Sequence, residues 1–411
     1  MLQMNEPHTK KSSCSYCGDA PINHPFSFWE SMIAITLDKY AKKFIKYVPF
    51  FVKDFADLVP EFLFRTLAFL GFVEFSGDIN KANSFRSRII WEEAKKRGII
   101  MEQVIFRDKP LDFYRAMLKI KNKSKNFYFE SIPIRPEFLD MDKNWDDKVV
   151  LKQEFKKCDI PVPIYFELSF FSFLKFKNKN TKEIFDKLPK PIIVKPRVGS
   201  RGRHTITNIH TLKQLHEGID TVLQICPYLI VEEHLKGNVC RATFVNGVLA
   251  GFYKGQSPTL IGDGKKTILE LIKDLDSGRR DRVLPIRIGK ELHDHISRSD
   301  FTIDDVLPVG VSLSLTHRIG RLFGGKTIEM IDDLHPSFIP ILTKAAKIVG
   351  LSVVGFDCII PDPSKEEVSQ KWGIIECNSL PFIDLHYYAL EGKPRNIAGM
   401  IWDLWENKQR I

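Results

Sequence analysis

The sequence predicts a mixed α/β protein, and three observations support this fold class. Segments that alternate like β-strands recur between segments with the helical period of 3.6 residues along most of the chain. The 411 residues are too many for one ordinary domain, so two or three are expected. Hydrophobic residues make up 44% of the chain, which is enough for a real core and excludes global disorder.

The charge and cysteine content restrict the class of partner and the compartment. There are 61 basic and 51 acidic residues, so the formal net charge of +10 favours an anionic partner. The basic residues are scattered, and we therefore do not expect nucleic acid binding. The seven cysteines lie mostly singly in apolar segments, which is typical of a reduced, cytoplasmic protein. We expect no signal peptide and no membrane-spanning segment, because no suitable apolar run is present.

Residues 1–25 are polar and rich in turn formers, and we expect a flexible N-terminal tail here. Cys14 and Cys17 have the C-x2-C spacing of half a zinc site. The second half is wrong for a zinc knuckle, because His8 and His24 flank the pair instead of following it as a close couple. The sequence therefore favours a tail over a structural zinc site at Cys14 and Cys17.

Two further units are expected before residue 144. Residues 26–76 are rich in aromatics at helical spacing, which predicts two or three helices packed on the rest of the chain. The alternative interpretation is that this segment contacts a membrane surface, because Phe and Lys fall on different sides of the predicted helices. In residues 77–143 predicted strands and helices alternate, including a helix at LDFYRAMLKI (111–120). This alternation predicts a small doubly wound α/β unit.

Residues 144–405 carry the strongest periodic patterns. DKVVLKQEFKKCDI predicts a helix that Pro161 ends, and 191–260 predicts mostly strands. A helix follows the Gly-Asp-Gly turn at 262–264, and residues 282–330 are glycine-rich and irregular. FIPILTKAAKIV predicts a helix ending at Gly350, two apolar strands follow, and NIAGMIWDLWENK predicts a closing amphipathic helix.

The segment PIIVKPRVGSRGRHTITNI contains the clearest candidate anion site. Lys195 leaves an apolar strand, so the backbone fixes the direction of its ammonium group. The loop of Gly199, Ser200, Arg201 and Gly202 offers backbone N–H groups that can fold over an anion. A fixed charge beside such a loop suits a polyphosphate, although no Walker pattern is present. An ordinary hairpin with a basic tip explains this segment equally well.

Carboxylates end three other predicted strands. Glu232 and Glu233 follow YLIV, where they suit an adenine edge or ribose hydroxyls, although paired glutamates usually form a solvated face. Asp357, Glu376 and Asn378 are hard oxygen ligands that suit Mg²⁺. Because Asp357 and Glu376 lie in apolar runs and an unpaired buried carboxylate is costly, a shared cation explains them better than isolated strand ends do.

Taken in order, these segments resemble the ATP-grasp ligases. The likeness runs from Asp146 to Trp405 and is greatest to the ATP-grasp module of the cyanophycin synthetases, with glutathione synthetases and D-alanine–D-alanine ligases further away. It is carried by DKVVLKQEFKKCDIPVP, IIVKPRVGSRGR, LIVEEHLKG, LIGDGKKTILELI, GGKTIEMIDDLHP, VGFD, IIECNSLP and HYYALEGKPRNIA. The resemblance implies an ATP-grasp fold over 144–405, in which two α/β subdomains clasp ATP and the smaller lid covers about 155–245.

The resemblance also implies roles for matched residues. Lys152 and Lys195 match lysines that hold the α- and β-phosphates, and residues 199–202 match the loop that closes over the transferred phosphate. Glu232 matches an adenine-binding position, with Glu233 as a substitute ribose contact. Arg241 matches an arginine that faces the phosphates or an acyl phosphate. Asp357, Glu376 and Asn378 match ligands of Mg²⁺, for which Mn²⁺ could substitute.

The implied activity is ATP-dependent amide formation from a small acid and an amine, through an acyl phosphate. Two positions depart from the family: Val239 replaces an acidic ribose contact, and Pro381-Phe382 replaces Pro-Gly. The alternatives are a phosphotransferase on the same fold and a module that binds ATP without turnover, which Val239 favours. The family also implies a homo-oligomer. The chain ends at Ile411 without a muramyl-ligase-like half, so we do not expect synthesis of the cyanophycin polymer.

Overall fold

The computed structural model describes residues 14–18, 21–45, 58–120, 123–134, 143–170, 181–281 and 283–407. Within these ranges the chain forms two four-stranded sheets, a five-stranded sheet and a two-stranded ribbon, with helices packed against them. The α/β class predicted from the sequence is confirmed. None of the helices in the described ranges is both long and apolar enough to cross a membrane.

The first sheet lies in the N-terminal unit and has the order β1-β2-β3-β4. Its strands are β1 (Val73–Ser76), β2 (Ile100–Phe106), β3 (Lys109–Ile120) and β4 (Lys123–Glu130), and every pairing is antiparallel. The doubly wound topology predicted for this unit is therefore wrong. The predicted helix at 111–120 is also wrong, because these residues form β3. Tyr114, Ala116 and Leu118 are buried at every second position, which is the strand period.

The helices of the aromatic-rich segment differ in how they pack. In α3 (Leu58–Phe69), the Phe64 ring stacks on Tyr128 of β4 at a centroid distance of 5.2 Å. α1 (His24–Ile45) contacts Phe170 through Phe28. It also exposes a stripe of large apolar side chains on one face, namely Phe26, Trp29, Ile33 and Leu37. Predicted helical residues 46–57 lie outside the described ranges.

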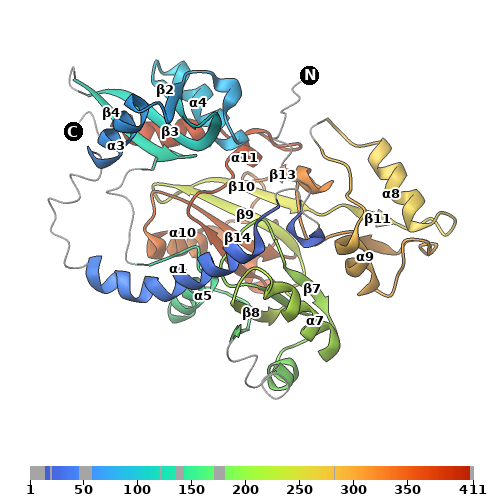
Figure 1. The fold of residues 1–411 in the computed structure, drawn as a ribbon. Helices are drawn as coiled ribbons and strands as arrows, with labels where there is room; N and C mark the ends of the chain where they lie inside the picture. The colour runs from blue at the N-terminus through green and yellow to red at the C-terminus, as the bar shows by residue number, and fades with distance from the viewer. Residues whose placement is uncertain are drawn as a thin grey trace.

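The five-stranded sheet forms the centre of the molecule (Figure 1). Its order is β13 (Lys326–Glu329), β10 (Val248–Gln256), β9 (Asn238–Val245), β14 (Val353–Ile360) and β15 (Gly373–Asn378). On one face its core includes side chains of α5 (Lys148–Lys157) and α10 (Phe338–Val349). On the other it packs against α12 (Ile397–Asn407) and α4 (Phe85–Lys96). As predicted, α10 ends at Gly350, which adopts the left-handed conformation.

The second four-stranded sheet has the order β5 (Tyr165–Ser169), β8 (Tyr228–Glu233), β6 (Ile192–Pro196) and β7 (Ile206–Ile209). The helix α7 (Leu212–Val222) covers it and was missed within the span predicted as mostly strands. The sequence pattern that marks the start of α7 is the capping box of Thr211 and Gln214. Residues 238–245, which the predicted lid boundary included, form β9 in the central sheet.

A separate lobe forms from residues 259–314 and lies beside the central sheet (Figure 1). It contains the ribbon of β11 (Thr259–Ile261) and β12 (Ser312–Ser314), with α8 (Ile268–Ser277) and α9 (Lys290–Ser297). Part of the region predicted as irregular is thus ordered secondary structure.

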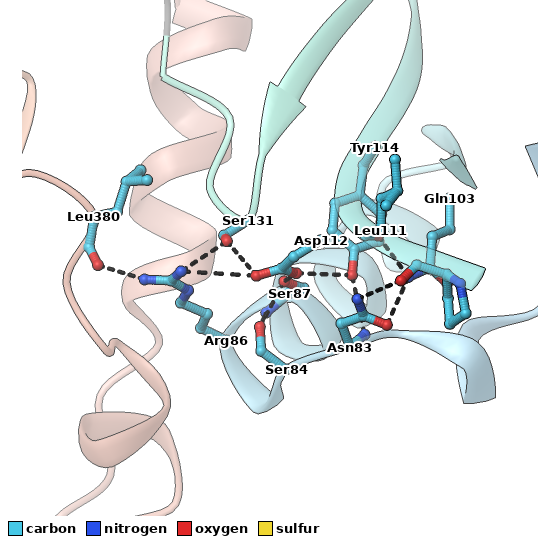
Figure 2. Close-up of polar contacts among 11 residues, drawn as sticks. Asn83, Ser84, Arg86, Ser87, Gln103, Leu111, Asp112, Tyr114, Ser131 and Leu380 are labelled. Carbon is cyan, nitrogen blue, oxygen red and sulfur yellow. Dashed lines mark hydrogen bonds and ion pairs between the residues drawn. The ribbon is translucent and has the colours of Figure 1, made fainter. Parts of the chain in front are cut away.

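Arg86 joins the N-terminal unit to the loop after β15. Figure 2 shows its guanidinium between the Leu380 carbonyl oxygen and the side chains of Ser131 and Asp112. Asp112 in turn accepts hydrogen bonds from Ser87 and Ser131, both at 2.6 Å. Because Arg86 and Asp112 each have several partners, this network fixes the N-terminal unit against the loop after β15.

Candidate functional site

A cavity of about 1040 Å³ lies between the central sheet and the sheet of β5–β8. All but one of the predicted site residues line it. These are Lys195, Gly199, Ser200, Arg201, Gly202, Glu232, Glu233, Arg241, Asp357, Glu376 and Asn378. The exception is Lys152, which is fully buried and does not line the cavity.

The predicted metal ligands lie on two neighbouring strands of the central sheet. Asp357 of β14 lies directly opposite Glu376 of β15 on one side and Arg241 of β9 on the other. Asn378 is two residues further along β15, so its side chain is on the same face as Glu376. Its amide nitrogen donates to Asp357 Oδ2 at 3.3 Å. Two neighbouring strands, β14 and β15, therefore bring two carboxylates and an amide oxygen to one wall of the cavity, and β9 adds Arg241 beside them.

Arg241 is paired with Asp357 through two parallel hydrogen bonds. Its Nε and Nη2 lie 2.6 and 2.7 Å from the two carboxylate oxygens. Burial would lower the pKa of Arg241, but the paired Asp357 raises it, so the group stays charged. Its Nη1 is buried and has no hydrogen-bond partner among the described residues. An unsatisfied guanidinium N–H at a cavity wall is suited to an anionic oxygen.

Glu232 lies between two lysines in the buried part of the site. Its Oε1 is 2.6 Å from Lys195 Nζ, and its Oε2 is 3.2 Å from Lys152 Nζ. Burial would raise the pKa of Glu232, but Lys152 and Lys195 hold it below the usual range. Burial lowers the pKa of Lys152 to about 8, although Glu232 opposes this. In this arrangement Glu232 orients cations, which differs from the adenine contact expected of it.

Lys148 is a cavity residue that the sequence reasoning missed. It lies one helical turn before Lys152 at the start of α5, where the Asp147 side chain accepts the Val149 N–H. Lys148 Nζ is 3.4 Å from Glu376 Oε2 and donates to the Gly199 carbonyl oxygen at 3.0 Å. It therefore contacts both the predicted metal site and the predicted phosphate loop. The two lysines are four residues apart on one helix face, and sequence alone does not show which one reaches the cavity.

The loop of residues 199–202 covers part of the cavity. Gly199, Arg201 and Gly202 have φ angles of 131°, 61° and 62°, a conformation that favours glycine at the first and last positions. The Arg201 guanidinium lies 5.5 Å from the centre of the Phe382 ring. Phe382 is the residue that departs from the Pro-Gly pattern, so this departure gives the loop a contact on the opposite wall.

Glu233 and Val239, the two positions considered for ribose contact, are poorly suited to bind ribose hydroxyls. Glu233 accepts the Ile164 N–H at 3.0 Å with one oxygen and pairs with Lys371 through the other. Both of its oxygens are therefore already engaged. Val239 lines the cavity at the position where an acidic residue was expected.

No known protein-family model matches the chain. Among curated proteins, 226 residues are 29% identical to cyanophycin synthetase from Trichormus variabilis, covering 53% of this chain and 25% of that protein. A second cyanophycin synthetase, from Crocosphaera subtropica, is 29% identical over 266 residues, which are 63% of this chain and 30% of that protein. This chain is similar to part of cyanophycin synthetase. The predicted resemblance to that ATP-grasp ligase is thus confirmed, and the chain spans less than a third of the length of these two relatives.

Similarity extends to proteins named for glutathione synthesis. The glutathione biosynthesis bifunctional protein of Mannheimia succiniciproducens is 24% identical over 276 residues, covering 62% of this chain and 35% of that protein. Among solved structures, the bifunctional glutathione synthetase of Pasteurella multocida aligns with a TM-score of 0.48 at 19% identity, over 79% of this chain and 44% of that one. D-alanine–D-alanine ligase from Bacillus anthracis aligns with a TM-score of 0.39 at 14% identity, over 65% and 69% of the two chains.

Proposed function

We propose that this chain is an ATP-dependent ligase that joins a carboxylate to an amine. The observation that carries the proposal is the shared cavity, in which three cations face three oxygen ligands. The cations are Lys148, Lys195 and Arg241, and the oxygen ligands are Asp357, Glu376 and Asn378. Such a pairing suits a magnesium–triphosphate, because the cations balance phosphate charge while the oxygen ligands hold the metal. Similarity to part of cyanophycin synthetase and to glutathione biosynthesis proteins supports the same assignment.

The donor set fits Mg²⁺ and ATP. Asp357, Glu376 and Asn378 would supply carboxylate and amide oxygens to the metal, and their chemistry would also admit Mn²⁺. When bound, Mg²⁺ would neutralise charge on the phosphates during transfer. Lys148 and Lys195, which both line the cavity, would bind the phosphates. This differs from the expected pair of Lys152 and Lys195, because Lys152 is shielded behind Glu232.

The residues account for the chemistry of amide formation. A carboxylate is a poor acyl donor until phosphorylation by the γ-phosphate converts its oxygen into a leaving group. The resulting acyl phosphate is then attacked by the amine, which displaces inorganic phosphate. The free Nη1 of Arg241 would stabilise negative charge that develops on the transferred group. The 199–202 loop would exclude water that hydrolyses the acyl phosphate.

An acidic group in the same cavity fits an amino acid or peptide-like substrate. Asp384 is buried and lines the cavity, where its Oδ2 accepts from Arg321 at 2.6 Å. Its Oδ1 is buried without a hydrogen-bond partner among the described residues. A substrate ammonium group would supply the missing donor. Asn83, Ser84 and Phe85 of the N-terminal unit line the cavity too, so this unit would help select the substrate.

The decisive experiment measures ATP turnover with amino acids and short peptides, added singly and in pairs. We expect ADP and inorganic phosphate to be released only when an acid and an amine are both present. We also expect mass spectrometry to detect the amide product. A phosphorylated product without free phosphate would replace the proposal with phosphotransfer. Tight ATP binding without hydrolysis under every combination would identify a binding module, the alternative that Val239 favours. We also expect the protein to be cytoplasmic and to form a homo-oligomer, and light scattering of the purified protein tests the oligomeric state.

The two lysines of α5 are expected to respond differently to replacement. Lys148→Ala should lower kcat by about 100-fold, because it removes a charge from the cavity wall. Lys152→Ala should mainly lower the free energy of unfolding, by up to about 3 kcal/mol, because it leaves buried Glu232 with one cation instead of two. Kinetics and urea denaturation of both variants check this. The reverse pattern, with Lys152→Ala inactive at full stability and Lys148→Ala active, would restore the original assignment.

A further inference from the structure

Four potential metal ligands meet where the N-terminal segment contacts the loop after β6. They are Cys14, Cys17, His24 and His204, and their ligand atoms all lie within 4.8 Å of one another. The Sγ atoms of Cys14 and Cys17 are each 3.5 Å from His204 Nε2. Cys17 Sγ is also 3.2 Å from His24 Nε2.

These distances are close to those of a tetrahedral zinc site. With Zn–S bonds near 2.3 Å and Zn–N bonds near 2.0 Å, neighbouring ligand atoms of a tetrahedron are roughly 3.6 Å apart. The three sulfur–nitrogen distances, from 3.2 to 3.5 Å, are slightly shorter than this. A small outward movement of the side chains would therefore complete the geometry. Two thiols and two imidazoles form a ligand set typical of structural zinc.

His204 is held in the orientation that a metal ligand needs. Its Nδ1 lies 2.7 Å from the Thr221 carbonyl oxygen, so this nitrogen carries the proton and donates it. Its Nε2 is then left with a lone pair facing the two sulfur atoms. His204 is fully buried and Cys17 almost so, while Cys14 and His24 are partly exposed. A metal held here would be shielded but could enter from the side of Cys14 and His24.

The residues around the cluster fix the N-terminal segment on two parts of the fold. The Tyr16 carbonyl oxygen accepts the backbone N–H of His204 at 3.2 Å and Arg318 Nη2 at 2.8 Å. Arg287 donates to the Gly18 carbonyl oxygen at 2.7 Å. The Tyr16 hydroxyl contacts Asp294 of α9. Residues 14–18 are thus packed between the β6–β7 loop and the lobe of α9, which is not the behaviour expected of a flexible tail.

We propose that Cys14, Cys17, His24 and His204 bind one structural zinc ion. The ion would fasten the N-terminal segment to the loop between β6 and β7. His204 is two residues after Gly202, so the same ion would anchor one end of the loop that covers the cavity. Sequence spacing identified the C-x2-C half, whereas His204 is far along the chain and only the fold brings it to the cysteines. His8, the other histidine considered, lies outside the described residues.

Metal content of the full chain, purified without a polyhistidine tag, tests the proposal. We expect about one zinc per chain by mass spectrometry of the elements. Cys17→Ser and His204→Gln should each lower this to less than about 0.2 per chain. Cys226→Ser is the matched control for Cys17→Ser, because Cys226 is also a free, buried cysteine and is not in the cluster. This control should keep its zinc.

Cobalt substitution makes the test independent of whether the variants fold. After chelator treatment, the wild-type protein should take up Co²⁺ and show the thiolate and tetrahedral absorption bands of a Cys₂His₂ site. Wild-type protein that contains no zinc and acquires no such bands would overturn the proposal. A Cys14–Cys17 disulfide found by thiol counting, or zinc kept by both cluster variants, would overturn it as well. Because every readout is metal or thiol content, failure here would leave the ligase proposal intact, and failure of the ligase assays would leave this one intact.

Discussion

Replacement of Lys195 with alanine is expected to abolish ATP turnover while the protein still folds. Lys195 lies near the end of β6 and lines the cavity, and its Nζ is 2.6 Å from Glu232 Oε1. Its removal deletes a fixed charge that would act on the phosphates as negative charge is redistributed in transfer. Loss of one such preorganised group typically costs about 100- to 1000-fold in kcat. Initial-rate measurement of ADP formation, with the substrate pair found by screening, gives the value directly.

The fold should survive this change, with a loss of stability comparable to that of Lys152→Ala, because Glu232 is again left with one cation instead of two. Lys152 remains 3.2 Å from Glu232, so the buried carboxylate is not left without a positive partner. Lys190→Ala is a suitable control, since Lys190 is exposed and precedes the opposite end of the same strand. Circular dichroism should show both variants folded, and only Lys195→Ala should be inactive. A Lys195→Ala protein with wild-type kcat and KM for ATP would remove this residue from the site.

The residues of the central sheet that line the cavity could be predicted from the sequence, because the patterns that mark them are local. Asp357 and Glu376 interrupt apolar strands, and a carboxylate in such a position needs a compensating group wherever the strand packs. The strand register then places Arg241 and Glu376 on either side of Asp357. Residue types and strand ends were therefore enough to identify this set, without knowledge of the strand order.

The features that the sequence alone did not settle depend on contacts between separate segments of the chain. The choice between Lys148 and Lys152 depends on how α5 docks against β15, which a helical period alone does not reveal. Residues 111–120 fit a helix and a strand almost equally, and pairing with β2 and β4 makes them a strand. His204, which contacts Cys14 and Cys17, is separated from them by almost half the chain. The contacts of α5 and of the cysteines join segments far apart in the chain, whereas residues 111–120 became a strand by pairing with the strands next to them in sequence.

Combined replacement of Glu376 and Asn378 with alanine is expected to remove both activity and the dependence of ATP binding on Mg²⁺. Both side chains lie on the same face of β15 at the cavity, and their loss leaves Asp357 alone to hold a metal while it is still paired with Arg241. One carboxylate that already neutralises an arginine is a weak site for a divalent cation. Calorimetric titration of ATP, with and without Mg²⁺, should show a difference in the wild-type protein and none in the double variant.

The control for this variant separates metal binding from general loss of negative charge. Glu366 is exposed in the connection between β14 and β15 and does not line the cavity, so Glu366→Ala removes a carboxylate without touching the site. It should keep wild-type turnover and Mg²⁺ dependence. Glu376→Ala also deprives Lys148 of its ion-pair partner, but the bond from Lys148 to the Gly199 carbonyl oxygen remains and should keep the lysine near the loop. A double variant that turns over ATP at the wild-type rate would show that the metal is held elsewhere, and the facing charges in this cavity would then need another ligand.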